Sequence, residues 1–219
     1  GKCMNGDNLY GDPIFGNEKH QHQHVASTLV SDELDDKWKK TITQLDMMFD
    51  VDSSTIFLVG EIVEGTMYDV IAKVRAILKL RSEASKDSPI NLVINSVGGD
   101  VYEVLGLIDY INSMTVKVNT ICRGKAFSAA ALLLACGTGK RYVSKNSSIM
   151  VHEISTEVFG KSSDIKVQNK HLATLDAAML DLLTSHSTQD KEFWRTATEK
   201  DFYMTVDTAL EYGIVDEVL

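Results

Sequence analysis

Three residue types in the second half of the chain could together perform acyl transfer with a serine nucleophile. Ser128 opens a run of alanines and leucines, and the free amides at the start of such a helix would stabilise negative charge near its hydroxyl. His152 follows a short apolar run, and histidine is the side chain that suits a general base near neutral pH. Asp201 and Asp207 could each orient this imidazole. The residues themselves do not choose between the two aspartates.

Each candidate also has an ordinary structural role. A serine at a helix start commonly caps the helix, and a histidine at the end of a strand is commonly a surface residue. The pair Gly98-Gly99 also follows an apolar run. Its backbone could turn an amide outward, as an oxyanion hole requires, or it could simply form a loop. The assignment therefore depends on whether the fold brings these positions together.

Predicted strands alternate with predicted helices around these residues. The predicted strands are short apolar runs rich in β-branched residues, and they cover 55–59, 90–94, 116–121 and 148–151. The predicted helices have apolar residues three and four apart, and they cover 34–49, 67–78, 101–112 and 128–136. This alternation predicts an α/β fold of stacked β-α-β units with a largely parallel sheet. Sites in such sheets lie at the carboxyl ends of strands.

The C-terminal third continues with helices. Residues 165–185 predict one long helix with apolar positions widely spread around it, which favours packing on another subunit or on its own core. Thr205 is the predicted cap of a last helix that ends at Gly213. A final strand is expected to begin at Ile214-Val215.

The first 30 residues carry no sustained apolar period, so we expect a flexible N-terminal extension over 1–30 and one domain over 31–219. Alternating histidines at positions 20, 22 and 24 could bind a transition metal. An unordered polar tract is the preferred interpretation, and no metal is expected in the functional site.

Composition narrows the classes of partner and compartment. Lys and Arg number 22 against 31 Asp and Glu, for a net charge of −9, which argues against nucleic acid as a partner. The cysteines at positions 3, 122 and 136 include no Cys-x-x-Cys pair, which fits free thiols in a reducing compartment. No stretch approaches the ~18 apolar residues of a membrane span. We therefore expect a soluble cytoplasmic protein without a membrane partner, with an organelle matrix or stroma as the alternative.

Five stretches of the sequence carry a resemblance to a known family. They are Ile94 to Gly99, Thr120 to Ala131, Gly139 to Arg141, Asn146 to His152 and Ala209 to Asp216. In this order and at these spacings they resemble ClpP, the proteolytic subunit of the ATP-dependent Clp protease. The resemblance runs from about Thr55 to Leu219 and implies the ClpP/crotonase-like fold with a projecting long helix.

The resemblance implies a serine endopeptidase with a Ser-His-Asp mechanism. In it Ser128 is the nucleophile, His152 is the general base, and Asp201 rather than Asp207 orients the imidazole. The backbone amides of Gly99 and Ala129 are implied to form the oxyanion hole. All three triad side chains are present, unlike in the inactive members of the family.

The resemblance also implies an assembly and its partners. Heptameric rings would stack into a tetradecamer, with the helix over 165–185 between the rings. Unfolded polypeptides would be threaded into the closed chamber by a hexameric AAA+ Clp ATPase. No cofactor is expected in the chain, because ATP would be used only by this unfoldase and Gly160-Lys161-Ser162 lacks the first glycine of a P-loop.

The sequence departs from the family at several positions. Val97 stands where the family usually has proline, and the segment from Glu153 to Val158 replaces a strand rich in proline and glycine. Polar residues stand where the family tends to have an apolar pocket for a loop of the ATPase; they are Asn91, Ser113, Arg123 and Ser144. We therefore expect catalysis to follow the family more closely than ATPase docking does.

Three alternative functions remain at this stage. The chain could be a catalytically silent or regulatory ring subunit whose triad is misaligned. It could be a crotonase-type acyl-CoA enzyme, because that superfamily shares the fold and a backbone oxyanion hole. It could also use a serine-lysine dyad with Lys125, although His152 would then have no role.

Overall fold

The computed structural model describes residues 36–39, 41, 47–155 and 159–219. The chain divides into two compact units, residues 1–42 and 43–219. In the first unit, residues 36–39 and 41 are helical, and the expected extension over 1–30 with its histidines lies outside the described residues. The helix expected over 34–49 is wrong at its C-terminal end, because Phe49 begins the strand β1 (Phe49–Asp50) of the second unit.

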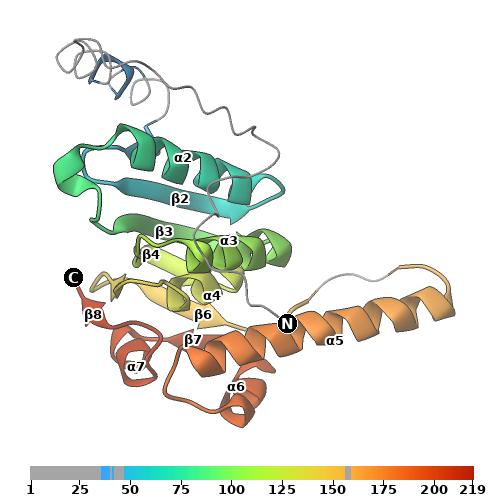
Figure 1. Ribbon diagram of the computed structural model, residues 1–219. Helices are drawn as coiled ribbons and strands as arrows, with labels where there is room; N and C mark the ends of the chain where they lie inside the picture. Colours follow the sequence, from blue (N-terminus) through green and yellow to red (C-terminus); the bar gives the residue numbers. More distant parts are fainter. Residues whose placement is uncertain (1–35, 40, 42–46, 156–158) are drawn as a thin grey trace, which may run out of the picture. The chain divides into compact units, whose positions relative to one another are not determined.

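A mostly parallel sheet of eight strands is the frame of the second unit (Figure 1). Its strand order is β1-β2-β3-β4-β5-β8, while β6 pairs with β4 and β7 pairs with β6. The strands are β2 (Thr55–Ile62), β3 (Ile90–Gly99), β4 (Val118–Phe127), β5 (Arg141–Val143), β6 (Ser148–Val151), β7 (Phe202–Met204) and β8 (Glu217–Val218). Among the described strands, only β1–β2 and β6–β7 pair antiparallel. The α/β fold with a largely parallel sheet is therefore confirmed.

Helices connect and cover these strands. They are α2 (Thr66–Leu80), the short 3-10 helix η2 (Glu83–Ser85), α3 (Val101–Ser113), α4 (Ala129–Ala135), α5 (Ser162–Ser185), α6 (Lys191–Thr198) and α7 (Val206–Glu211). All seven residues of α4 are alanine or leucine and all are buried, so α4 lies in the core against β3 and β4. Because α4 begins directly after β4, the core fixes the position of the turn between them.

The long helix α5 has 24 residues, which at 1.5 Å per residue makes it about 36 Å long. It packs against α4 and α6, and its N-terminal end extends well beyond the sheet (Figure 1). Its buried residues are Met179, Leu180 and Leu183, all in its C-terminal half. The N-terminal half of α5 therefore projects from the second unit, and Val167 on it is 69% exposed.

The second half of the chain contains three short elements that the sequence pattern does not predict. The strands β5 and β7 have three residues each, too few to show a period, and α6 has eight. Thr205 caps α7 as predicted, because its hydroxyl accepts from the amide of Thr208 at 3.2 Å. The last strand begins at Glu217 rather than at Ile214, since Ile214 and Val215 are buried core residues ahead of it.

Two further observations concern the membrane and the thiols. No helix in the described part of the chain is long and apolar enough to cross a membrane. Cys122 and Cys136 are free and buried. Burial raises the pKa of Cys122 to about 11 and that of Cys136 to about 12. Both thiols are therefore protonated at neutral pH.

Candidate active site

The pairing of β6 with β7 brings His152 and Asp201 together. These strands are antiparallel, and their last aligned pair is Val151 opposite Phe202. His152 comes directly after Val151, and Asp201 comes directly before Phe202. His152 and Asp201 therefore lie opposite each other, one position beyond the last aligned pair of these strands.

The pairing of β4 with β6 brings Ser128 to the same place. These strands are parallel, with Phe127 opposite Met150. Ser128 follows Phe127, and its amide donates to the Met150 carbonyl at 2.7 Å. Since His152 lies two residues beyond Met150, the serine and the histidine leave neighbouring strands at the same carboxyl edge.

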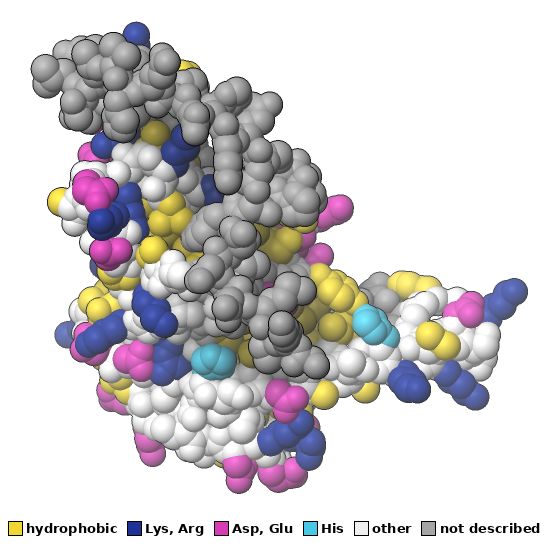
Figure 2. Space-filling view, viewed as in Figure 1, with side chains coloured by type: hydrophobic (Ala, Val, Ile, Leu, Met, Phe, Trp, Pro, Cys, Tyr) yellow, Lys and Arg dark blue, Asp and Glu magenta, His cyan; other side chains and the backbone are white. Residues whose placement is uncertain are grey.

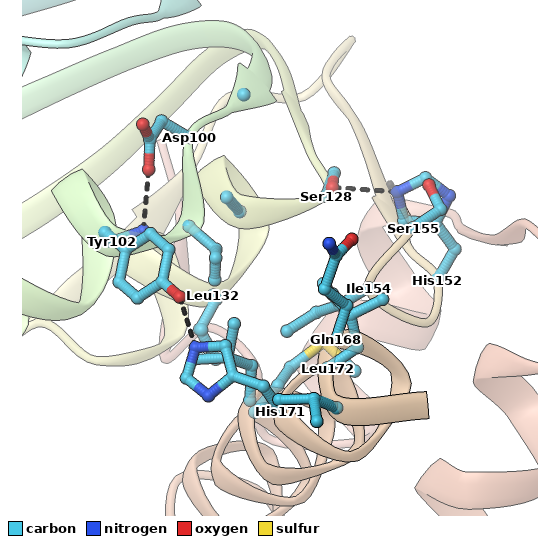
Figure 3. A pocket seen from close by; sticks show the side chains of 16 residues that line it. Asp100, Tyr102, Ser128, Leu132, His152, Ile154, Ser155, Gln168, His171 and Leu172 are labelled. Carbon is cyan, nitrogen blue, oxygen red and sulfur yellow. Dashed lines mark hydrogen bonds between the residues drawn. The ribbon is translucent and has the colours of Figure 1, made fainter. Parts of the chain in front are cut away.

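Ser128, His152 and Asp201 form one chain of hydrogen bonds. The His152 Nε2 atom lies 2.8 Å from the Ser128 Oγ atom, a contact drawn in Figure 3. The His152 Nδ1 atom lies 3.1 Å from the Asp201 Oδ1 atom. A neutral imidazole with its proton on Nδ1 satisfies both contacts, because it donates to the carboxylate and accepts from the hydroxyl.

The two alternatives to these partners lie elsewhere. Asp207 is exposed in the first turn of α7 and lines a different surface hollow, beside Lys145 and Val218. Lys125 lies in β4 opposite Ser148. Within the described residues, the imidazole rather than the ammonium group is therefore bonded to Ser128.

The backbone at Ser128 has an unusual conformation. Its φ is 57° and its ψ is −125°, and Ser54 is the one other non-glycine residue with positive φ in the described chain. Strained residues of this kind persist where the surrounding structure holds them, often at functional sites. Ser128 occupies the N-cap position of α4, but its side chain makes no capping hydrogen bond. The capping role considered from sequence is thus not what the structure contains; the hydroxyl faces His152 instead.

Gly98 and Gly99 belong to strand β3 rather than to a loop, since they pair with Glu61 and Ile62 of β2. Their φ angles are +86° and +149°. A Cβ atom at Gly98 would lie 2.5 Å from the Phe127 carbonyl oxygen and 3.1 Å from the Ala129 amide nitrogen. The absence of a side chain therefore lets β3 lie directly against the turn that carries Ser128.

Ser96 holds this stretch of β3 in place. It is completely buried, and its hydroxyl accepts from the Gly98 amide at 3.0 Å and donates to the Gly60 carbonyl at 2.5 Å. The β2–β3 and β3–β4 registers each shift here by an irregularity. The Ser96 hydroxyl thus satisfies two backbone groups where the regular ladder is interrupted.

A cavity of about 650 Å³ opens beside Ser128, between α3, α4 and α5. One end is lined by Gly99, Ser128, Ala129 and His152. Its walls are mainly apolar and include Leu132, Ile154, Val167, Leu172, Leu175 and Met179. Figure 2 shows hydrophobic side chains gathered where α5 meets the rest of the unit. The arrangement combines a hydrogen-bonded serine with an apolar space large enough for substrate side chains.

Tyr102, Gln168 and His171 are polar residues of this cavity that the sequence analysis missed. In Figure 3, the Gln168 amide points into the cavity and the Tyr102 hydroxyl meets the His171 ring. No sequence signal identifies these residues, because they lie on two helices whose relative placement depends on tertiary packing.

Cys136 is a second side chain that lies beside a histidine. The Cys136 Sγ atom lies 3.8 Å from His186 Nδ1, but burial raises the pKa of this thiol to about 12. The same Nδ1 atom lies 2.9 Å from the Leu182 carbonyl oxygen. This cysteine-histidine contact is thus a feature of the core. Three or more His, Cys, Asp or Glu side chains able to hold a metal do not cluster anywhere in the described residues.

The four polar residues noted from the sequence lie on different elements: Asn91 on β3, Arg123 on β4, Ser144 directly after β5 and Ser113 at the end of α3. The Arg123 Nη1 atom donates to Ser144 Oγ at 3.1 Å, and the Asn119 Nδ2 atom donates to Asn91 Oδ1 at 3.0 Å. This surface of the sheet is therefore organised by polar contacts in this chain.

Comparisons with known proteins show the family to which this chain belongs. The family model described as Clp protease matches residues 36–219. The ATP-dependent Clp protease proteolytic subunit 3 of Frankia casuarinae is 37% identical over 165 residues, which cover 75% of this chain and 76% of the relative. The chain belongs to the Clp protease family and is a serine-type peptidase of the ClpP kind.

Proposed function

We propose that this chain is a serine endopeptidase that hydrolyses peptide bonds of unfolded proteins within a closed ring chamber. The observation that carries the proposal is the hydrogen-bonded series of Ser128, His152 and Asp201, with contacts of 2.8 and 3.1 Å. Hydrogen bonds between an alcohol, an imidazole and a carboxylate are the arrangement that activates a serine.

In the proposed mechanism, His152 Nε2 takes the Ser128 hydroxyl proton as Oγ attacks the carbonyl carbon of a peptide. Asp201 holds the imidazole in the productive tautomer and stabilises the cation that forms. His152 then gives the proton to the leaving amine, which breaks the C–N bond and leaves an acyl group on Ser128. A water molecule, deprotonated by His152 in the same way, releases the acid and restores the hydroxyl.

The amides of Gly99 and Ala129 are the proposed donors to the tetrahedral oxyanion. Two observations support them. Both residues line the cavity beside Ser128, and the position a Cβ atom would take at neighbouring Gly98 is 3.1 Å from the Ala129 nitrogen. Backbone donors of this kind are fixed before substrate arrives, so they need no reorganisation during the reaction.

The proposed assembly is a tetradecamer of two heptameric rings, with α5 in the contact between rings. Membership of the Clp protease family supports it, as does the exposed apolar residue Val167 on the projecting half of α5. A hexameric AAA+ Clp ATPase is the proposed partner that unfolds and delivers substrates. ATP would be consumed by that partner, and the peptidase itself would need no cofactor.

A catalytically silent ring subunit is the second candidate. It would share the fold and the assembly but would fail to form an acyl-enzyme. The hydrogen bonds of His152 on both sides favour the active subunit over it. The crotonase-type alternative has less support, because enzymes of that type usually act through carboxylates and need no serine nucleophile, whereas Ser128 is bonded to His152.

A fluorophosphonate probe tests the proposal, because it labels only a serine activated for attack. We expect stoichiometric labelling of the wild-type protein at Ser128 and none of the Ser128→Ala variant. Native mass spectrometry of the same samples should show that both variants form the same rings. Rings that form but are never labelled would identify the silent subunit instead.

A further inference from the structure

Phe202, the residue directly after Asp201, belongs to a cluster of four aromatic side chains. Each ring contacts the three others, with centroids 5.1 to 6.4 Å apart. These distances lie within the range of about 4.5–7 Å in which aromatic pairs attract each other. The rings of Phe202 and Tyr212 are stacked at an interplanar angle of 16°, and the other pairs meet edge to face. The members of this aromatic cluster are Phe193, Trp194, Phe202 and Tyr212.

The aromatic cluster joins β7 to two helices. Phe193 and Trp194 lie on α6, and Tyr212 directly follows the last residue of α7. Trp194 is completely buried, and its Nε1 atom donates to Ser187 Oγ at 2.8 Å. Because the Trp194 ring is fixed by burial and by this hydrogen bond, it is a rigid surface against which the Phe202 ring packs.

Strand β7 and Asp201 have few other restraints. The strand has three residues, and among the described strands it pairs with β6 alone. The Asp201 side chain is 56% exposed, and within the described residues its carboxylate is hydrogen-bonded only to His152. A carboxylate without further donors does not hold itself in place. Its position therefore depends on the backbone at the start of β7, where Phe202 is the next residue.

Helix α6 also holds the backbone on the histidine side of this pair. The amide of Glu153, the residue after His152, donates to the Thr198 carbonyl at 2.8 Å. Thr198 is 2% exposed, and its hydroxyl donates to the Trp194 carbonyl at 2.7 Å. The helix that contributes two rings to the aromatic cluster is thus tied to the chain beside His152 as well as beside Asp201.

We infer that Phe202 is a positioning residue, whose packing in the aromatic cluster holds the start of β7 so that the Asp201 carboxylate meets His152. This inference rests on the proposed peptidase function, in which Asp201 orients the imidazole. Of the described residues that line the cavity beside Ser128, none belongs to the aromatic cluster. Loss of the Phe202 ring should therefore lower kcat through Asp201 and leave KM unchanged.

The first test replaces the ring by an aliphatic side chain. Phe202→Leu stays apolar and loses the ring contacts, and a fluorogenic peptide reports its kcat and KM. Labelling to completion with the fluorophosphonate probe counts the active serines, so that kcat is expressed per labelled Ser128. We expect kcat to fall about ten- to a hundredfold, with KM changed less than about twofold. Phe202→Tyr keeps the ring and should recover most of the lost kcat.

The second test asks whether the effect passes through Asp201. In an Asp201→Asn background the carboxylate is already absent, so adding Phe202→Leu should lower kcat by less than about threefold further. Where turnover becomes too slow to follow, the rate of fluorophosphonate labelling gives the same comparison. A general loss of structure would instead lower the rate by the same factor in both backgrounds.

Phe49→Leu is the matched control for losing a ring. Phe49 is 5% exposed and lies on β1, at the opposite end of the strand order from the β6–β7 pair. This variant should leave kcat per labelled serine unchanged. Native mass spectrometry checks that each variant assembles as the wild type does. If Phe202→Leu does not assemble, Phe193→Leu replaces it, because it removes an edge-to-face partner of Phe202 on α6 and should lower kcat at least about threefold.

The outcomes separate the inference from the proposed function. Wild-type kcat in an assembled Phe202→Leu variant, or in Phe193→Leu where that variant replaces it, would overturn the inference and leave the peptidase intact. Equal losses with and without the Asp201 carboxylate would also overturn it, because the ring would then act by another route. Absence of both peptide cleavage and fluorophosphonate labelling in the wild-type protein would overturn the proposed function, and the inference with it.

Discussion

Replacing Gly98 by alanine should abolish most of the activity while leaving the fold in place. The new Cβ atom would lie 2.5 Å from the Phe127 carbonyl oxygen, 3.0 Å from Ser128 Cβ and 3.1 Å from the Ala129 nitrogen. These neighbours are backbone or the start of a side chain, so the turn itself must move. A carbon-oxygen contact normally needs more than 3 Å, and a displacement of several tenths of an ångström would therefore reach the nucleophile.

Gly60→Ala is a matched control for the backbone cost. Gly60 has a φ of +87°, nearly the same as the +86° of Gly98, but a Cβ atom there would have no neighbour within 4 Å. Both variants should lose about 1–3 kcal/mol of unfolding free energy, because alanine is disfavoured at this φ. Only Gly98→Ala should also disturb Ser128 and the Ala129 amide.

The expected loss of activity in Gly98→Ala depends on which groups the new Cβ atom displaces. Loss of one oxyanion donor typically costs a hundredfold to a thousandfold in kcat, and misplacing reacting atoms by about 1 Å costs a similar factor. We expect kcat/KM on a peptide substrate to fall at least about a hundredfold in Gly98→Ala and less than about threefold in Gly60→Ala. The assay is run on rings verified by native mass spectrometry. Equal losses in the two variants, or full activity in Gly98→Ala, would refute the reasoning.

Three further predictions concern individual side chains. Asp201→Asn should lower kcat by about 10³- to 10⁴-fold, because the amide no longer fixes the imidazole tautomer. Asp207→Asn should leave kcat unchanged. Steady-state kinetics compares the two variants, and equal effects on kcat would contradict the choice of Asp201. Hydrogen bonds from Arg141 hold the pKa of Asp216 below its ordinary value of 3.8, so this pair stabilises the fold above about pH 4 and loses that contribution as pH falls through the lowered pKa. Asp216→Asn should therefore lose at most about 1 kcal/mol of unfolding free energy, because the carboxylate is 40% exposed. In urea titrations this loss should be largest at pH 7 and should shrink toward pH 3. A loss that grows on acidification would contradict the prediction. Iodoacetamide at pH 8 should leave Cys136 unmodified in the folded protein, since burial raises its pKa to about 12; peptide mapping that finds it alkylated as fast as in urea would show that the site opens.

The sequence predicts the part of the site that depends on well-marked strands. An apolar run ends directly before His152, whereas the strand predicted over 116–121 ends seven residues before Ser128 and in the structure continues to Phe127. Because the carboxyl ends of parallel strands lie at one edge of a sheet, the pattern still places both residues near that edge. Asp201 is different because β7 is only three residues long. The pairing of β7 with β6 brings Asp201, and not Asp207, next to His152. A strand this short shows no period in the sequence, so the pattern does not predict the pairing. The choice of Asp201 over Asp207 came from the resemblance to ClpP and not from the pattern of apolar residues.

The remaining differences arise from tertiary packing. Two adjacent glycines normally indicate a turn, yet Gly98 and Gly99 continue β3 because Ser96 satisfies the backbone groups around them. Phe49 follows the helical period of the residues before it, but it pairs with Ile56 across β1 and β2. The contact between Tyr102 and His171 spans two helices far apart in sequence. No local rule predicts it, because it depends on the direction in which α5 leaves the sheet.

The junctions that carry Ser128, His152 and Asp201 are each fastened to the sheet within one residue of the side chain they present. The N-terminal half of α5 lies outside these junctions and does not set the spacing of the three groups. It can therefore change its length or its partner while the three groups stay in place, whereas α4 cannot, because its buried residues fix the turn at Ser128. A lineage could exchange this projecting half to acquire new substrates or a new neighbour while keeping the same chemistry.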